Sequence, residues 1–329
     1  MTNLTEFTFL SSDGKTRLHA MQWLPVETPR AVLQISHGVA EHIGRYDGFA
    51  RYLNEQGIAV VGHDHLGHGG SLPEGGTPVY FGDGTPWETV VADIQLLHEQ
   101  LRREFSGVPL CLMGHSMGSF LARSYLIRYP GTLRAAIIMG TGWQPQAKLT
   151  GGRAVAEVVC AAQGPSSASK LVNDLAFGGY NKAFAPNRTG YDWLSADSEN
   201  VDRYIADPLC GADATVGLFR QMLHGIAFNQ SPKNLARMDS SLPVLLISGD
   251  LSLMYSILPF LIIYGDRDPV GDMGKGVRRT AAAFRKAGLS DVTVKLYPGL
   301  RHEILNEGPM RQTVYEDIWH WLEPQLSAR

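Results

Sequence analysis

The chain has 329 residues, of which 44% are hydrophobic and 19% charged, so it can bury a large core and is not disordered or fibrous. Its formal net charge of −3, from 29 basic and 32 acidic residues, argues against nucleic-acid binding, which needs a clustered basic face. The N-terminus has no secretory-signal pattern and no run of about 18 apolar residues occurs, so we expect a cytoplasmic protein without a membrane span.

The chain opens with strand patterns. Residues 7–10 and 18–24 alternate between apolar and polar side chains, and Asp13-Gly14 between them is typical of a type I′ hairpin. Four continuous apolar runs follow, as expected of parallel strands that are buried on both faces. These runs cover residues 31–35, 58–61, 110–113 and 135–139.

Helical patterns separate the apolar runs. The first helix ends at Gly57, and the sequence Thr-Pro-Trp-Glu at 85–88 has capping-box spacing, with proline at the first helical position, for a second helix through Leu101. A third helix ends before Pro130-Gly131. The first helix has one apolar face, formed by Tyr46, Phe49, Ala50 and Leu53. This alternation predicts an α/β fold with a mostly parallel central sheet flanked by helices.

The alternation lapses between residues 142 and 235, where short helical patterns mix with glycine, proline and aromatic residues. We interpret residues 142–235 as a helical lid over the carboxyl edge of the sheet, and residues 1–141 with 236–329 as the α/β core. Strand patterning resumes at Leu242 and at residues 292–297. A final helix carries three apolar residues on one face, namely Val314, Ile318 and Leu322.

The sequence Gly114-His115-Ser116-Met117-Gly118 lies directly between an apolar strand and a helical pattern. In this context a G-x-S-x-G sequence predicts a sharp strand-to-helix turn that exposes a serine nucleophile. We therefore expect Ser116 to be catalytic and His115 to be its structural neighbour.

A serine nucleophile needs a base and an acid that orients the base, which in this fold follow it in the order acid, then histidine. His302 lies just past the last strand and Asp268 just past the preceding one. Both are therefore expected at the sheet edge where Ser116 emerges. Asp266 is the alternative acid.

A repeated strand sequence affects which aspartate can serve as the acid. LPVLLISGD at 242–250 recurs as LPFLIIYGD at 258–266, so residues 242–266 contain a tandem-duplicated strand segment. Asp250 occupies the place of Asp266 in the first copy, and Ser252 that of Asp268. We expect the second copy to form the central strand, because the downstream chain connects to it without a gap. If the first copy formed it, we would expect Asp268 to be displaced and the triad to fail.

An oxyanion hole needs two backbone N–H donors. The residue after the nucleophile, Met117, is the first candidate. Val39 is the second, because His37-Gly38-Val39 forms a tight turn after the strand that ends at Ile35.

The histidine cluster and the cysteines could suggest a metal site, but we expect both to have structural roles. His63, Asp64, His65 and His68 do not have the spacing of a helical zinc motif, and we expect a hydrogen-bonded loop. The cysteines are odd in number and widely spaced, so we expect them to be reduced and structural. They are Cys111, Cys160 and Cys210. We expect no metal and no cofactor.

These motifs together resemble the monoacylglycerol lipase and lysophospholipase-like branch of the α/β-hydrolases, a branch also grouped with serine aminopeptidase-like hydrolases. The resemblance covers nearly the whole chain and rests on HGVAEHIGRYDGFARYL, GHDHLGHGGS, GHSMGS, WLSADSENVDRYIADPLCG, GDRDPVG and YPGLRHEILNE. It implies an esterase with the triad Ser116, Asp268 and His302, oxyanion donors Val39 and Met117, and a helical lid over an acyl pocket. The chain departs from the family in its duplicated strand and in Ser119, where a second glycine is common.

The resemblance implies hydrolysis of a carboxylic ester with an apolar acyl chain and a small polar head, such as a monoacylglycerol or a lysophospholipid. Phe177, Tyr180 and Trp193 of the lid are candidates to line the acyl pocket, although each could equally serve only to pack the lid. The alternatives are a peptidase, and a ligand-binding or duplication-inactivated protein without catalysis. We expect a small-molecule ester as the partner, no nucleic acid and no stable membrane insertion; transient membrane contact and the oligomeric state are left open.

Overall fold

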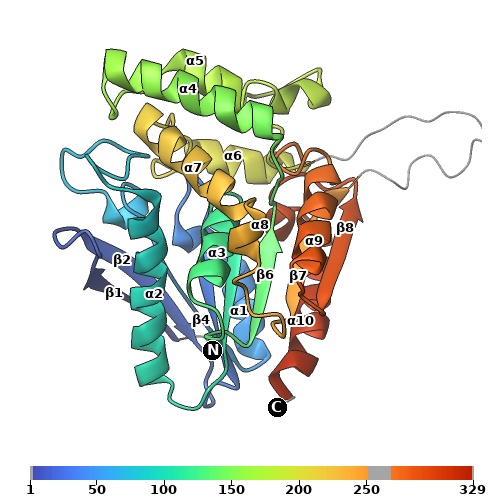
Figure 1. The fold of residues 1–329 in the computed structure, drawn as a ribbon. Helices are drawn as coiled ribbons and strands as arrows, with labels where there is room; N and C mark the ends of the chain where they lie inside the picture. The colour runs from blue at the N-terminus through green and yellow to red at the C-terminus, as the bar shows by residue number, and fades with distance from the viewer. Residues whose placement is uncertain (1–2, 251–267, 328–329) are drawn as a thin grey trace, which may run out of the picture.

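The computed structural model describes residues 3–250 and 268–327, which form one sheet of eight strands flanked by helices (Figure 1). The strand order is β1-β2-β4-β3-β5-β6-β7-β8. The pairs β1–β2 and β2–β4 are antiparallel, and the other pairs are parallel. The strands are β1 (Asn3–Leu10), β2 (Arg17–Leu24), β3 (Ala31–Ser36), β4 (Ile58–His63), β5 (Leu110–His115), β6 (Ala135–Met139), β7 (Val244–Asp250) and β8 (Val292–Pro298). The predicted α/β architecture is confirmed.

The opening hairpin is present, but its predicted type I′ turn is wrong. Leu10 pairs with Arg17, so residues 11–16 form the connection. Gly14 has a φ of +75°, whereas the Asp13 side chain accepts hydrogen bonds from the N–H groups of Lys15 and Thr16. Asp13 therefore organises a longer loop through its carboxylate instead of occupying a two-residue turn.

Helices cover both faces of the sheet, so the parallel strands are buried on both sides. One core cluster contains Leu245 and Ile247 of β7 together with residues of α1 (Asp47–Glu55) and α10 (Met310–Ser327). The other contains Val244 and Leu246 together with residues of α2 (Trp87–Glu104), α3 (Met117–Arg128) and α9 (Lys275–Lys286). Successive residues of a strand point to opposite faces, which is why β7 must be apolar at each of these positions.

The predicted helix ends are correct at one place and wrong at another. Helix α1 ends before Gly57, whose φ of +78° suits the residue after a helix. At α2, however, Pro86 is the N-cap and no side chain caps the helix. The Trp87 N–H instead donates to the side chain of a residue far along the chain, Gln221 Oε1, at 3.1 Å. The capping box predicted at Thr85 is therefore not formed.

Between β6 and β7 the chain forms a group of helices at one end of the sheet (Figure 1). These are α4 (Gln146–Gln163), α5 (Lys170–Ala176), η3 (Tyr180–Phe184), α6 (Ser198–Ala206), α7 (Val216–Asn229) and α8 (Pro232–Leu235). We call residues 142–235 the inserted segment. In the described part of the chain, no helix combines the length and the apolar character needed to cross a membrane.

The expectation for the repeat is wrong, because the first copy forms the central strand. Residues 244–250 are β7, in which Ala136 of β6 pairs with Val244 and Asp250 pairs with Pro298 of β8. The second copy, at 258–266, lies outside the described residues. The chain downstream nevertheless connects to the sheet through α9 and β8.

Candidate active site

Ser116 lies at the turn between β5 and α3, as the sequence predicts. Its φ of 54° and ψ of −121° are strained values for a residue with a side chain. The two glycines of the motif allow this turn, because a Cβ at Gly114 would lie 2.3 Å from Gly118 O, and one at Gly118 would lie 2.0 Å from Ser36 O. Ser119 fits the site of the usual glycine and donates its hydroxyl hydrogen to Ser116 O at 2.6 Å.

Asp268 and His302 form a buried pair. His302 Nδ1 is 2.9 Å from Asp268 Oδ1, and the two residues are 2% and 0% exposed. Burial raises the pKa of Asp268, but the charge and hydrogen bond of His302 and the hydroxyl of Ser248 outweigh it and leave this pKa below its ordinary value. A carboxylate on Nδ1 leaves Nε2 of the ring as the atom that can accept a proton.

Although the first repeat copy forms β7, Asp268 is not displaced from His302, contrary to our expectation. Ser248 of β7 donates its hydroxyl hydrogen to Asp268 Oδ2 at 2.6 Å, and the Val270 N–H donates to Oδ1 at 3.0 Å. The acid is therefore held at the end of the strand built by the first copy. The alternative acid, Asp266, lies outside the described residues, and Asp250 is the last residue of β7.

The turn after β3 lies against the start of α3. Val39 lines the same cavity as Ser116 and His302, and Met117 is the first residue of α3. The Gly38 N–H is already used, since it donates to Glu41 Oε1 at 2.5 Å. The end of β3 and the start of α3 are in close contact, because a Cβ at Gly118 would lie 2.0 Å from Ser36 O, and a Cβ at Gly38 would lie 3.0 Å from Ser116 Cβ.

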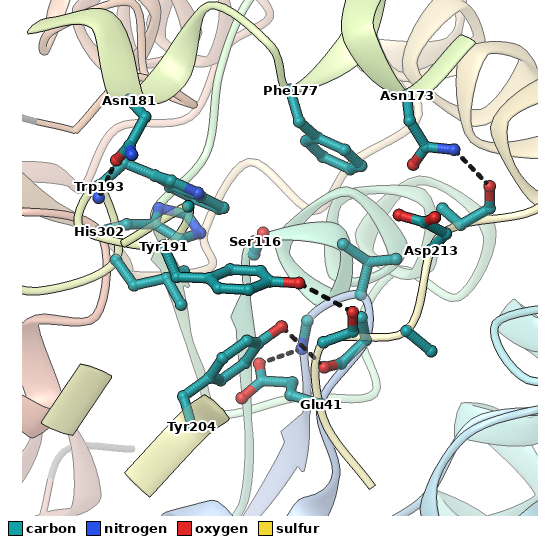
Figure 2. Close-up of a pocket in the computed structure, with 18 of the residues that line it drawn as sticks. Glu41, Ser116, Asn173, Phe177, Asn181, Tyr191, Trp193, Tyr204, Asp213 and His302 are labelled. Carbon is teal, nitrogen blue, oxygen red and sulfur yellow. Dashed lines mark hydrogen bonds between the residues drawn. The ribbon is translucent and has the colours of Figure 1, made fainter. Parts of the chain in front are cut away.

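Two aromatic rings hold the imidazole of His302. The ring of Trp193, from the inserted segment, lies 5.2 Å away at an interplanar angle of 37° (Figure 2). The ring of His115 lies 4.7 Å away, and its Nε2 is 3.3 Å from His302 O. His115 is thus a structural neighbour of Ser116, as expected, and it also contacts His302.

Sequence reasoning missed Glu41, which joins the turn after β3 to His115. Glu41 Oε1 lies 3.1 Å from His115 Nδ1 and accepts a hydrogen bond from the Tyr46 hydroxyl at 3.0 Å. Burial raises the pKa of Glu41 and lowers that of His115, but their mutual hydrogen bond and charge reverse both effects. The net result is a carboxylate with a lowered pKa beside an imidazole with a raised pKa.

A second missed group ties the inserted segment to the loop that carries His302. Arg45 pairs with Glu303, next to His302, and with Glu41 at 3.1 Å. Asn200 of α6 donates to Glu303 Oε2 at 2.8 Å. Glu307 accepts hydrogen bonds from the hydroxyl of Ser195 and from the backbone N–H groups of residues 196 and 197. These residues lie within the motifs on which the resemblance rests, but the sequence pattern did not single them out, and only their contacts show what they do.

A cavity of about 410 Å³ opens above Ser116, between the core and the inserted segment (Figure 2). Phe177 and Trp193 line it, as predicted. Tyr180 is not among its lining residues, and instead packs against Phe177 at 5.7 Å and Trp193 at 5.0 Å. The volume is in the range of small-molecule binding sites.

The histidines of residues 63–68 are buried and neutral. Burial lowers the pKa of His63 to about 3 and that of His68 to about 4, and it also lowers that of His65. His65 Nε2 contacts Ser36 Oγ at 3.1 Å and His68 Nδ1 contacts Leu66 O at 2.9 Å, whereas neither nitrogen of His63 has a partner among the described residues. The expected hydrogen-bonded loop is present except at His63.

Comparison with known proteins agrees with this geometry. Residues 27–309 match the family described as serine aminopeptidase, S33. The chain is 30% identical to a monoacylglycerol lipase of Mycolicibacterium smegmatis over 95% of each chain, and 28% identical to the human monoglyceride lipase over 97% of this chain and 90% of that one. A carboxyl esterase from Bacillus coagulans has a TM-score of 0.86 and 25% identity over 99% of this chain and 100% of that one.

The fold and the site define an α/β-hydrolase. The chain belongs to the serine aminopeptidase S33 family, in the monoacylglycerol lipase-like branch that its motifs resemble, and this family membership makes it a carboxylic ester hydrolase.

Proposed function

We propose that the protein hydrolyses carboxylic esters of the monoacylglycerol type, with Ser116 as nucleophile, His302 as general base and Asp268 as the acid that orients the base. The observation that carries the proposal is the buried His302–Asp268 pair, whose imidazole lines the same cavity as Ser116.

In the first half of the reaction, the Ser116 hydroxyl attacks the ester carbonyl and His302 Nε2 takes its proton. Asp268 accepts the Nδ1–H of His302 and stabilises the imidazolium that forms. The N–H groups of Val39 and Met117 stabilise the negative oxygen of the tetrahedral intermediate. Glu41 supports this hole, because it binds the Gly38 N–H and so fixes the turn that presents Val39.

In the second half, the imidazolium of His302 protonates the departing alcohol, which leaves Ser116 acylated. A water molecule then attacks the acyl group and gives its proton to His302, which passes it to Ser116 Oγ as the bond to the acyl carbon breaks and the carboxylic acid leaves. The same two N–H donors stabilise the second tetrahedral intermediate. No step needs a metal or a cofactor.

We further propose that the inserted segment, residues 142–235, is a lid over the core formed by residues 1–141 and 236–329. It contributes Phe177, Trp193 and Tyr204 to the cavity, so the acyl chain would lie between the lid and the core. Glu41 and His115 also line the cavity, and their polar side chains would lie beside the polar head of the substrate.

A peptidase would need a buried carboxylate to bind the amino group of its substrate. Four carboxylates line the cavity. Asp174 pairs with Lys170 at 2.6 Å and Asp213 is exposed. Glu41 and Glu303 are buried, but both already pair with Arg45. None of the four is a buried carboxylate left over to bind a substrate amine, which favours an ester substrate.

The substrate class is tested by comparing turnover of a monoacylglycerol series of increasing acyl length, a lysophospholipid with the same acyl chains and an amino-acid p-nitroanilide. We expect monoacylglycerols to have the highest kcat/KM and the anilide to be inert. A higher kcat/KM for the anilide than for every ester would overturn the proposal, and no turnover of any substrate by folded protein would favour a ligand-binding role.

A further inference from the structure

Three metal-binding side chains from distant parts of the chain meet beside the turn that carries Val39. His42 is the N-cap of η1 (Ile43–Tyr46), Asp207 is the C-cap of α6, and Cys210 lies three residues later. Their ligand atoms all lie within 4.8 Å of one another. We propose that His42, Asp207 and Cys210 form a binding site for a zinc-type divalent ion, separate from the ester-hydrolysing residues.

The donor set selects the kind of ion. An imidazole nitrogen, a carboxylate oxygen and a thiolate sulfur together suit Zn²⁺, whereas Mg²⁺ and Ca²⁺ prefer oxygen donors alone. Three protein ligands leave the fourth position of a tetrahedral zinc ion for water. The three side chains are half-buried, so the ion would be partly shielded and still reachable from solvent.

The geometry needs only small movements. Zinc bonds of about 2.0–2.3 Å place two tetrahedral ligands roughly 3.3–3.8 Å apart. His42 Nε2 and Asp207 Oδ2, now 2.9 Å apart, would separate slightly and exchange their hydrogen bond for bonds to the ion. The other carboxylate oxygen, Asp207 Oδ1, accepts the Leu209 N–H at 2.9 Å, which holds the carboxylate in place as an outer hydrogen bond does at known metal sites.

The surrounding charges favour a cation. Four charged groups interact with the Cys210 thiol. Burial is the main cause of the raised pKa of this thiol, the carboxylates of Glu41, Asp207 and Glu303 raise its pKa further, and the guanidinium of Arg45 lowers it. Three carboxylates against one guanidinium around the sulfur give a charge balance that favours a positive ion there.

Ion binding would release a proton. The thiol of Cys210 loses its proton to solvent as the sulfur–zinc bond forms, and neutral His42 carries its remaining proton on Nδ1. Affinity should therefore rise with pH.

The site would add a third link between the inserted segment and the turn. The Tyr204 hydroxyl and the Gly211 N–H both donate to Ala40 O, at 2.9 Å and 3.0 Å. A zinc ion on His42, Asp207 and Cys210 would join the same two pieces of chain by coordination bonds, with His42 two residues after Ala40 and Cys210 one residue before Gly211.

The test is calorimetric titration of tag-free, chelator-treated protein with Zn²⁺, together with absorption spectra after addition of Co²⁺. We expect one ion per chain in the wild type, a cobalt–thiolate charge-transfer band, and a rise in melting temperature. In His42→Ala and in Cys210→Ser we expect affinity to fall at least 10-fold, and in Cys210→Ser the band to vanish.

Two matched controls remove the same residue types elsewhere: Cys160→Ser in α4 and His224→Ala in α7. Both should bind Zn²⁺ as the wild type does. Unchanged affinity in His42→Ala and Cys210→Ser, or a cobalt–thiolate band that depends on Cys160, would overturn the proposal. Because these readouts do not use ester turnover, they stand or fall independently of the proposed reaction.

Discussion

The indole ring of Trp193 lies 5.2 Å from the imidazole of His302, so a residue of the inserted segment contacts the proposed general base directly (Figure 2). His115 contacts the same imidazole at 4.7 Å. Because packing on both neighbours restricts rotation of the ring, the position of Nε2 depends on the inserted segment as well as on the core.

Trp193→Ala should therefore lower kcat about 10-fold and change KM much less, because a freely rotating imidazole spends less time in reach of Ser116. Steady-state kinetics with a soluble short-chain ester provide the measurement. The control is Tyr180→Phe, since Tyr180 packs on Trp193 at 5.0 Å and has no ring contact with His302 among the described residues. A rise in KM at constant kcat would show that Trp193 only binds substrate.

Asp268→Asn should lower kcat about 10⁴-fold, because an amide cannot hold His302 in the required tautomer. Asp250→Asn should retain activity within a few-fold, since Asp268 already occupies the position beside Nδ1 of His302. Hydrolysis of p-nitrophenyl butyrate by the two variants separates the candidates. Full activity in Asp268→Asn would show that Asp268 is not the acid that orients His302.

Deletion of residues 251–266 should give a folded and active enzyme. It joins Asp250 to Arg267 and so restores Gly-Asp-Arg-Asp with one copy of the repeat. The deletion is expected to be tolerated because Ser248 Oγ lies 2.6 Å from Asp268 Oδ2, so the strand end and the acid are already adjacent. Circular dichroism and ester turnover check this, with deletion of 16 residues from α4 as a control that should unfold the inserted segment. Loss of the fold would show that the second copy is needed.

Glu41→Gln should lower stability with a specific pH dependence. The pKa of Glu41 lies below its ordinary value of 4.5, so its contribution is present above that pH and is lost as pH falls. The pKa of His115 lies above its ordinary value of 6.5, so its contribution is present below that pH and is lost as pH rises through the raised value.

The difference in free energy of unfolding between wild type and Glu41→Gln should thus be largest between about pH 5 and 6.5 and should shrink in more alkaline solution. Urea denaturation at several pH values measures it. The control, Glu55→Gln, removes a carboxylate from the end of α1 and should show no such maximum. A difference that is constant from pH 5 to 9 would contradict the proposed charge pairing.

Much of the fold could be predicted because parallel strands buried on both faces need mostly apolar residues, as β3 to β7 have. The turn at Ser116 was predictable for a similar reason, since close contacts at Gly114 and Gly118 exclude side chains. Two local predictions were wrong. The Asp13 carboxylate binds the N–H of the flanking Lys15 and organises a longer loop than the predicted two-residue turn. The N–H of Trp87 at the start of α2 donates to the distant Gln221, and the predicted capping box at Thr85 is not formed.

The choice between the two repeat copies could not be made from the strand pattern, because both copies satisfy it. Position 248 of the first copy is serine, and the equivalent position of the second is Tyr264. Only the three-dimensional arrangement shows that the serine hydroxyl binds Asp268. Glu41, Arg45 and Glu303 were missed because charged residues in a sequence are normally on the surface, and their burial depends on partners far along the chain.

The central claim is that Ser116 forms an acyl-enzyme, and its most direct test is intact-mass measurement after incubation with a fluorophosphonate, combined with p-nitrophenyl butyrate turnover. Wild type and the surface control Ser290→Ala should each gain one phosphonyl group and lose turnover. Ser116→Ala should gain none and should turn over ester at least about 10⁴-fold more slowly than the unlabelled wild type. Equal labelling of Ser116→Ala, or turnover close to that of the wild type, would contradict the account.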